Sequence, residues 1–139
     1  MVGLVLVSHS RALVEGLRDI VAQFGGDAVP VGLAGGTADG RLGTTADRVV
    51  AAIREVLIAG GADGGAVVLF DFGSAALSVE LALEELEPSE RSRVRIPAAP
   101  LVEGAFAAGV QASIDGSLDA VAQAAAAAAS LPKGIGEPA

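Results

Sequence analysis

The sequence contains a single histidine, His9, and an aspartate, Asp71, that follows a second apolar run. Imidazole ordinarily titrates near neutral pH, so His9 is the first candidate for acid–base or nucleophilic chemistry there. We expect Asp71 to accept a hydrogen bond from one ring nitrogen, which fixes the tautomer and leaves the other nitrogen as a nucleophile. The alternative interpretations are an ordinary histidine at a strand end and a turn-forming aspartate before Gly73.

Hydroxyl and glycine residues near these two predict an anion site. The run from Gly35 to Thr44 favours either a nest of backbone amides or a simple flexible connection. Helix N-termini favour negative charge, and both His9 and Gly73 precede predicted helices. Together these features predict a phosphate site with a nucleophilic histidine. The expected phosphate-binding residues are Ser10, Gly36, Thr37, Thr44, Gly73 and Ser74.

The sequence lacks the residue types or patterns that several other kinds of catalytic or binding site require. The chain has no cysteine, and its one lysine, Lys133, lies in the C-terminal segment, which leaves no internal lysine for a Schiff base or a nucleotide-binding loop. Ser74 lacks the G-x-S-x-G surroundings of a hydrolase nucleophile, so we expect it to be a helix N-cap or a phosphate donor. One histidine and scattered acids offer no ligand spacing, and we expect no metal site.

Composition narrows the class of protein further. The 139 residues are 52% hydrophobic, which excludes a disordered chain. The net charge of −8 argues against nucleic-acid binding. No apolar run reaches the roughly 18 residues of a membrane span. Without a basic leader before the first apolar run, we expect a cytoplasmic protein.

The pattern of apolar runs predicts the elements that position the candidate site. Apolar runs predict strands, and apolar residues three and four apart predict helices. A capping box is predicted at Thr44–Asp47. The predicted strands are Val2–Val7, Ala28–Leu33, Ala66–Phe72 and Val94–Ile96. The first predicted helix carries the apolar residues Leu13, Leu17, Ile20 and Phe24. The later helices include Val49–Leu57, Leu77–Leu86, Leu101–Ile114, and Ser117 to Ala129.

This alternation predicts a three-layer α/β fold with a mainly parallel sheet, strand order 2-1-3-4, and helices on both faces. In such a sheet the crevice lies at the carboxyl ends of strands 1 and 3, where His9 and Asp71 stand. We expect residues 1–130 to form one domain and residues 131–139 to form a flexible tail.

Five segments form a recognisable set, in order along the chain: Gly3-Leu-Val-Leu-Val-Ser-His9-Ser, Gly35-Gly-Thr, Leu42-Gly-Thr-Thr, Leu69-Phe-Asp-Phe-Gly-Ser-Ala75 and Ala99-Pro-Leu-Val-Glu-Gly-Ala105. They resemble the phosphocarrier subunits of phosphoenolpyruvate-dependent dihydroxyacetone kinase, which are relatives of the IIA domains of mannose-type sugar phosphotransferase systems. The resemblance runs from Met1 to about Val121. Phe72 stands where the family's Asp-Leu-Gly-Ser-Ala motif usually has leucine.

The resemblance implies a phosphotransferase subunit phosphorylated on His9. The phosphoryl group would come from the phosphocarrier HPr, charged by enzyme I, and would pass to ADP on the DhaL subunit. The regenerated ATP would phosphorylate dihydroxyacetone on DhaK. ADP, ATP and Mg would then belong to DhaL, with no cofactor on this chain, and relatives are commonly homodimers. A mannose-type IIA domain and a non-catalytic regulatory module of similar fold remain alternatives.

Overall fold

Four apolar segments form a fully parallel sheet in the computed structural model, which describes residues 1–136. The strands lie in the order β2-β1-β3-β4, which confirms the predicted order. In the central pairings, Leu4 lies opposite Val31 on one side and Val67 on the other. The strand bounds are β1 (Val2–Ser8), β2 (Val31–Gly35), β3 (Gly65–Phe70) and β4 (Val94–Arg95).

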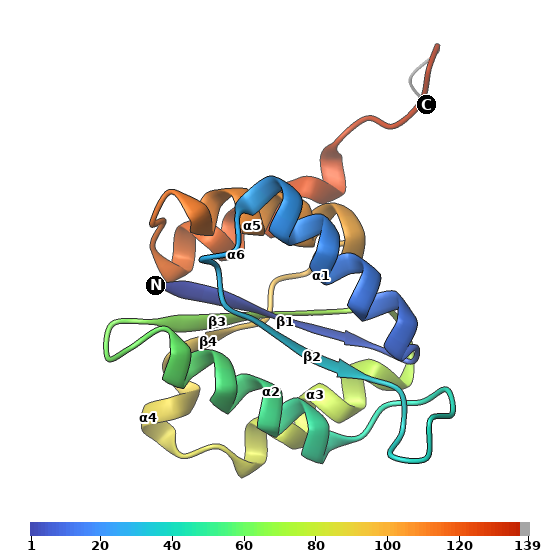
Figure 1. Cartoon of the computed structure of the whole chain (residues 1–139), viewed down its shortest axis with the longest axis vertical. Coiled ribbons are helices and arrows are strands. Elements are labelled where there is room, and N and C mark those ends of the chain that lie inside the picture. Colours follow the sequence, from blue (N-terminus) through green and yellow to red (C-terminus); the bar gives the residue numbers. More distant parts are fainter. Residues whose placement is uncertain (137–139) are drawn as a thin grey trace.

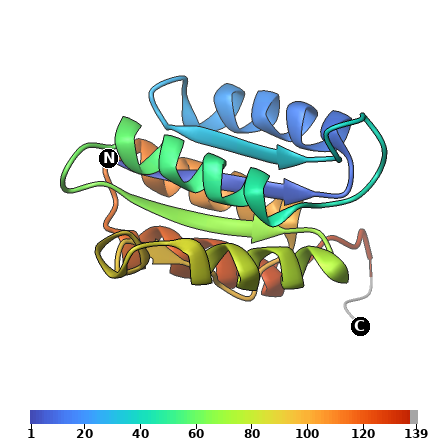
Figure 2. The same cartoon turned by 90° about the horizontal axis from the view of Figure 1, so that it is seen from below.

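Helices cover both faces of this sheet and make a three-layer α/β fold (Figure 1). One face carries α1 (Arg11–Gly25), α5 (Leu101–Ser113), α6 (Leu118–Ala127) and the short helix η1 (Ala128–Ser130). The other face carries α2 (Ala46–Ala59), α3 (Ser74–Glu85) and α4 (Pro88–Arg91), of which α4 was not predicted. Figure 2 shows β2 as the outermost strand on the side away from β4.

The central strand β1 supplies side chains to two separate cores. Successive side chains of a strand point to opposite faces. Leu4 and Leu6 therefore pack with α1, α5 and α6, whereas Val5 and Val7 pack with α2 and α3. All four are fully buried, and burial of each stabilises the fold by roughly 1.5–3 kcal/mol. This burial holds the carboxyl end of β1, and the residues after it, in a fixed place.

The buried face of α1 differs from the predicted one. Of Leu13, Leu17, Ile20 and Phe24, only Leu17 is buried, and Phe24 is 61% exposed. Both this stripe and the observed one satisfy helical spacing, so periodicity could not choose between them. The residues that face the core are Val14, Leu17, Val21 and Gly25.

A close helix contact explains which face of α1 is buried. Gly25 packs against the backbone of Gly109 in α5, and a Cβ atom added to Gly25 would lie 2.8 Å from the Gly109 carbonyl oxygen. Only glycine permits this approach. Leu77 and Leu81 of α3 are likewise exposed, because α3 turns its small residues Ala75 and Ala82 toward the sheet.

Several predicted details of the elements are wrong. Strand β3 ends at Phe70 rather than Phe72, and the carboxyl ends of the other strands differ from their predicted positions by one or two residues. Strand β2 begins at Val31 rather than Ala28, directly after Pro30, whose carbonyl accepts a hydrogen bond from the Leu4 amide. The predicted capping box at Thr44–Asp47 does not form: Thr45 is the N-cap of α2 and makes no side-chain cap bond. By contrast, the predicted cap at Ser117 is confirmed, because its hydroxyl accepts from the Ala120 amide.

The described residues that follow η1 do not belong to the three layers of the fold. Residues 131–136 have no helix or strand, and Lys133 forms an ion pair with Glu103 of α5. The last part of the predicted tail, residues 137–139, lies outside the described residues. No helix in the described range 1–136 is long and apolar enough to cross a membrane.

Candidate active site

The carboxyl ends of β1 and β3 bring His9 and Asp71 together. Val7 lies opposite Phe70 in the sheet, and the Asp71 amide extends this pairing by donating to the Val7 carbonyl over 3.1 Å. His9 and Asp71 are therefore the first residues beyond two neighbouring strands. This is the crevice that the strand order predicts.

The Asp71 carboxylate collects four hydrogen-bond donors. Oδ2 accepts from the Ser8 hydroxyl and from the His9 backbone amide, each over 2.9 Å. Oδ1 accepts from the Phe72 amide over 2.7 Å. Both oxygens lie 3.1 Å from Nδ1 of His9. Burial raises the pKa of Asp71, but the hydrogen bonds from His9, Phe72 and Ser8 outweigh it and hold the pKa below its ordinary value.

This ionised carboxylate determines the tautomer of His9. A carboxylate only accepts hydrogen bonds, so Nδ1 must carry the proton that it donates to Asp71. In the neutral ring Nε2 then has a free lone pair. The Ser74 hydroxyl lies 3.0 Å from Nε2 and donates to it. The His9 side chain is 22% exposed, so the ring is partly open to solvent at the crevice.

The ring of Phe72 stacks on the imidazole ring of His9. Its ring centroid lies 4.7 Å from that of His9, with 17° between the ring planes. Phe72 itself is 67% exposed. Phe72 had no role assigned from the sequence beyond its replacement of the family's usual leucine, so this contact was not predicted. An aromatic residue next to the acid of the motif was the available signal, because it can stack on a neighbouring imidazole.

The turn before α3 presents free amides beside His9. Gly73 is the N-cap of α3 with a positive φ of 58°, so the expectation of Ser74 as a possible N-cap is wrong. The Ala75 and Ala76 amides bond back to Phe72 and Gly73. Within the described chain, the amides of Gly73 and Ser74 have no acceptor. They remain available to an anion, together with the Ser74 hydroxyl.

The glycine-rich loop does not offer the expected nest of free amides. The Gly36 amide donates to the Ser8 carbonyl over 3.3 Å, and the Thr37 amide to the Arg41 carbonyl over 2.9 Å. The Gly43 amide donates to the carbonyl of His9 over 2.9 Å. The amides of Gly36 and Gly43 are thereby engaged in holding the Ser8 and His9 carbonyls, and the Thr37 bond closes a turn within the loop. The loop therefore stabilises the backbone at His9.

Two further predicted phosphate ligands are engaged within the protein. The Thr44 hydroxyl pairs with the buried Ser78 hydroxyl over 2.7 Å. Ser10 is the N-cap of α1: its hydroxyl accepts from the Leu13 amide, and its own amide donates to the Ser8 hydroxyl. Of the six predicted phosphate ligands, the structure brings Ser74 into contact with His9 and leaves the amides of Gly73 and Ser74 without an acceptor in the described chain.

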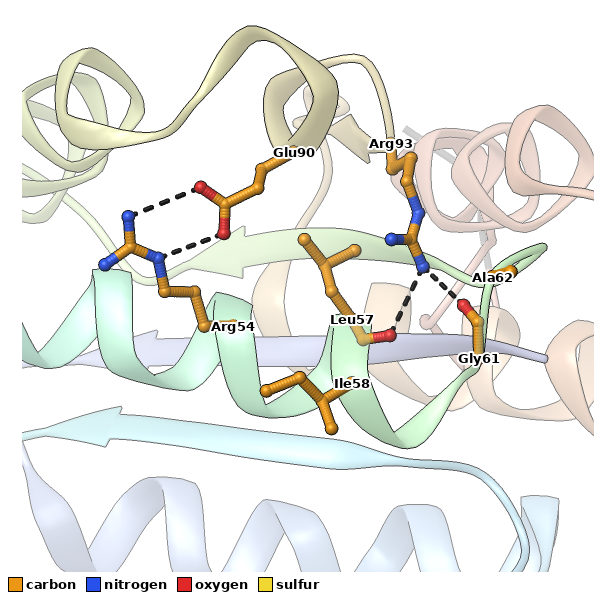
Figure 3. Close-up of a pocket in the computed structure, with 7 residues that line it drawn as sticks. All are labelled: Arg54, Leu57, Ile58, Gly61, Ala62, Glu90 and Arg93. Atoms are coloured by element: carbon orange, nitrogen blue, oxygen red, sulfur yellow. Dashed lines mark hydrogen bonds and ion pairs between the residues drawn. The ribbon is translucent and has the colours of Figure 1, made fainter.

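A pocket of about 390 Å³ lies away from this site, between the C-terminal half of α2 and the segment that carries Glu90 and Arg93 (Figure 3). Its charged groups have internal partners. Arg54 forms an ion pair with Glu90 over 3.0 Å, and Arg93 donates to the carbonyls of Leu57 and Gly61. This pocket has neither a nucleophile nor an unpaired charge. In the described part of the chain, no three side chains of metal-binding type come together.

Comparisons with known proteins bear on this site. A family model described as the PTS system fructose IIA component, EIIA-man, matches residues 3–122. The phosphoryl donor subunit DhaM of PEP-dependent dihydroxyacetone kinase 2 from Listeria innocua is 42% identical over 127 residues, covering 88% of this chain and 95% of that protein. DhaM from Escherichia coli is 43% identical over 87% of this chain, which spans only 25% of that longer protein.

A solved structure supports the fold assignment. The crystal structure of a protein described as of unknown function, EF1359, matches with a TM-score of 0.80 and 32% identity. The match covers 90% of this chain and 92% of the other.

Proposed function

This chain belongs to the EIIA-man family of phosphotransferase-system IIA components, and from that membership we propose that it is the phosphoryl donor subunit of a dihydroxyacetone kinase. We propose that it accepts a phosphoryl group from HPr on Nε2 of His9 and passes it to ADP bound on a DhaL subunit. The observation that carries the proposal is the Asp71–His9–Ser74 arrangement, in which Nδ1 is bonded to a carboxylate and Nε2 faces a hydroxyl.

The proposed reaction has two halves, and the first transfers the phosphoryl group from one nitrogen atom to another. The Nε2 lone pair of His9 attacks the phosphorus of the donor's phosphohistidine. The phosphorus–nitrogen bond of the donor breaks, and its electron pair returns to the donor nitrogen. The His9 ring then carries positive charge, which the adjacent Asp71 carboxylate stabilises through the Nδ1–H bond of 3.1 Å. In the second half, a terminal phosphate oxygen of ADP attacks and His9 leaves as a neutral ring.

The crevice offers donors for the phosphoryl oxygens. The Ser74 hydroxyl turns from Nε2 to the incoming group, and the amides of Gly73 and Ser74 stand at the positive end of α3. Mg and nucleotide belong to the acceptor subunit in this proposal. The exposed ring of Phe72 beside the nucleophile provides apolar surface for the alternating partners.

We also propose that the protein is a homodimer joined through α1 and α5. Phe24 of α1 and Phe106 of α5 meet edge to face, with their ring centroids 5.3 Å apart, and both are exposed. Ile20 and Leu13 of α1 and Val102 of α5 are also exposed. A second copy would remove this apolar face from water. We further infer that residues 1–130 form the phosphocarrier domain, because both cores lie within this range.

The experiment that tests the function also separates it from the alternatives. The protein is incubated with phosphoenolpyruvate, enzyme I and HPr, and its intact mass is measured before and after addition of DhaL·ADP. We expect a gain of one phosphoryl group that DhaL·ADP removes, with formation of ATP. A gain that only a sugar-transporter IIB subunit removes would identify a mannose-type IIA domain. No gain would favour a non-catalytic regulatory module.

A further inference from the structure

The three arginines without an internal partner line one pocket. The sequence has eight arginines and one lysine against 17 acids. Six of these nine basic side chains have a partner within the protein. Arg91 and Arg93 donate to backbone carbonyls, and four others form ion pairs with carboxylates: Arg41, Arg54, Arg95 and Lys133. Within the described residues the other three, Arg11, Arg18 and Arg48, have no carboxylate within ion-pair distance. All three line a pocket of about 340 Å³.

This pocket lies along the free edge of the sheet. Arg11 and Arg18 are seven residues apart on α1 and share one side of that helix, whereas Arg48 belongs to α2 on the opposite face of the sheet. Leu33 and Gly35 of the edge strand β2 also line the pocket. The arginines therefore flank the exposed edge of β2 from both sides of the sheet, where Figure 2 shows no further strand.

The backbone of β2 has unused hydrogen-bonding groups at this edge. The Leu4 amide donates to the Pro30 carbonyl and the Gly36 amide to the Ser8 carbonyl, which marks the two ends of the ladder with β1. Backbone groups of a parallel strand alternate between its two sides. The N–H and C=O groups of Val31, Leu33 and Gly35 therefore turn away from β1. Nothing else in the described chain pairs with them.

Charge and backbone together define the occupant. Guanidinium groups stay charged at every physiological pH, so the cluster is a positive patch on a chain of net charge −8. Glu15 is the one acid in the pocket lining and leaves it net positive. An extended segment can pair its backbone with a free strand edge while its carboxylates reach arginines on both sides. A compact anion would use the arginines but leave the strand edge unpaired.

We propose that the β2 edge is a docking site for an extended acidic segment of a partner protein, which adds as a further strand beside β2. A Cβ atom added to Gly35 would lie 2.9 Å from the Ser10 carbonyl oxygen and 2.9 Å from the Arg11 Cα atom, so the docked segment lies next to the chain that carries His9. The proposal does not depend on the phosphoryl transfer proposed above, because it concerns binding at a different edge of the molecule. Charge complementarity would also speed the encounter at low salt.

The test is a titration of the 15N-labelled full chain with a short synthetic peptide of alternating glutamate and valine, followed by amide NMR shifts. We expect saturable shifts at Val31, Leu33 and Gly35, and none with the matched lysine–valine peptide. Arg48→Gln should weaken binding about two- to fivefold. Arg54→Gln, the same change on the same helix, should leave binding unchanged, because Arg54 is paired with Glu90.

A second variant separates strand addition from simple charge attraction. Leu33→Pro removes an outward-facing amide but no bond to β1, and proline is tolerated at such edge positions. We expect it to weaken the peptide while leaving the far-ultraviolet circular dichroism unchanged. If Leu33→Pro does not fold, the amide shifts decide: strand addition predicts shifts at Val31, Leu33 and Gly35 together, whereas charge attraction alone predicts shifts only around the arginines.

Three results would overturn the proposal. The first is an absence of shifts along β2 at high peptide concentration. The second is the same set of shifts with inorganic phosphate alone, which would identify a small-anion pocket. The third combines two observations: the triple variant Arg11→Gln/Arg18→Gln/Arg48→Gln self-associates, and the unchanged protein does not bind the peptide. In that case the arginines serve only to prevent aggregation through the β2 edge.

Discussion

Asp71 holds both the backbone and the ring of His9. Its Oδ2 atom lies 2.9 Å from the His9 amide nitrogen and 3.1 Å from Nδ1 of the same residue. The imidazole is therefore oriented relative to its own main chain, with Nε2 directed to Ser74. One carboxylate thus fixes the position, the tautomer and the charge environment of the imidazole that we propose as the nucleophile.

Replacement of this carboxylate should slow phosphoryl transfer. Asp71→Asn keeps the shape but removes the negative charge that stabilises the phosphorylated ring, and its amide can reverse the tautomer. We expect transfer from HPr to slow by more than tenfold, which corresponds to about 1.4 kcal/mol of barrier. Quench-flow kinetics measure this rate, with circular dichroism as the check on folding. Transfer at the unchanged rate would refute the positioning role.

The same carboxylate should make stability depend on pH. Hydrogen bonds hold the pKa of Asp71 below its ordinary value in the folded protein. Its contribution to the free energy of unfolding is therefore fully present above the unfolded pKa of about 3.9. It is lost as pH falls through the lower folded pKa.

Urea unfolding at several pH values tests this linkage. The stability difference between the unchanged protein and Asp71→Asn should be largest near neutral pH and shrink in acid. Asp63→Asn, at an exposed carboxylate in the turn after α2, is the control and should show no such trend. A difference for Asp71→Asn that stays constant into strong acid would contradict the lowered pKa.

The Ser74 hydroxyl should contribute modestly to transfer. It lies 3.0 Å from Nε2 and is placed to donate to a phosphoryl oxygen. A net contribution of about 0.5–1.5 kcal/mol predicts a rate about two- to tenfold lower in Ser74→Ala. Ser113→Ala, which removes a hydroxyl bonded to the Val110 carbonyl of α5, should transfer normally. Equal rates in the two variants would exclude a contact between Ser74 and the phosphoryl group.

The sequence predicted the sheet order and the meeting of His9 with Asp71, because right-handed crossovers running outward from strand 1 in both directions place strands 1 and 3 side by side. It did not predict which face of α1 is buried, since two overlapping stripes share Leu17 and only the contact between Gly25 and Gly109 selects one. Nor could it show that the amide of Gly36 is already engaged. Composition reveals a glycine-rich loop but not where its amides point.

The apolar face on α1 and α5 should control the oligomeric state. Phe106→Glu places a charge beside Phe24 in the proposed interface, so we expect sedimentation equilibrium to change from dimer to monomer. Ile58→Glu is the control, because Ile58 is 81% exposed on α2 at the opposite face of the sheet. An unchanged protein that is monomeric, or a Phe106→Glu protein that stays dimeric, would rule out this interface.

Identification of the phosphorylated nitrogen tests the central claim most directly. The 15N-labelled protein is charged with phosphoenolpyruvate, enzyme I and HPr, and the imidazole nitrogens are observed by long-range 1H–15N NMR. We predict one acid-labile, alkali-stable phosphoryl group on Nε2 of His9, with Nδ1 still protonated against Asp71, and no mass gain in His9→Ala. A phosphoryl group on Nδ1, or an undiminished mass gain in His9→Ala, would contradict it.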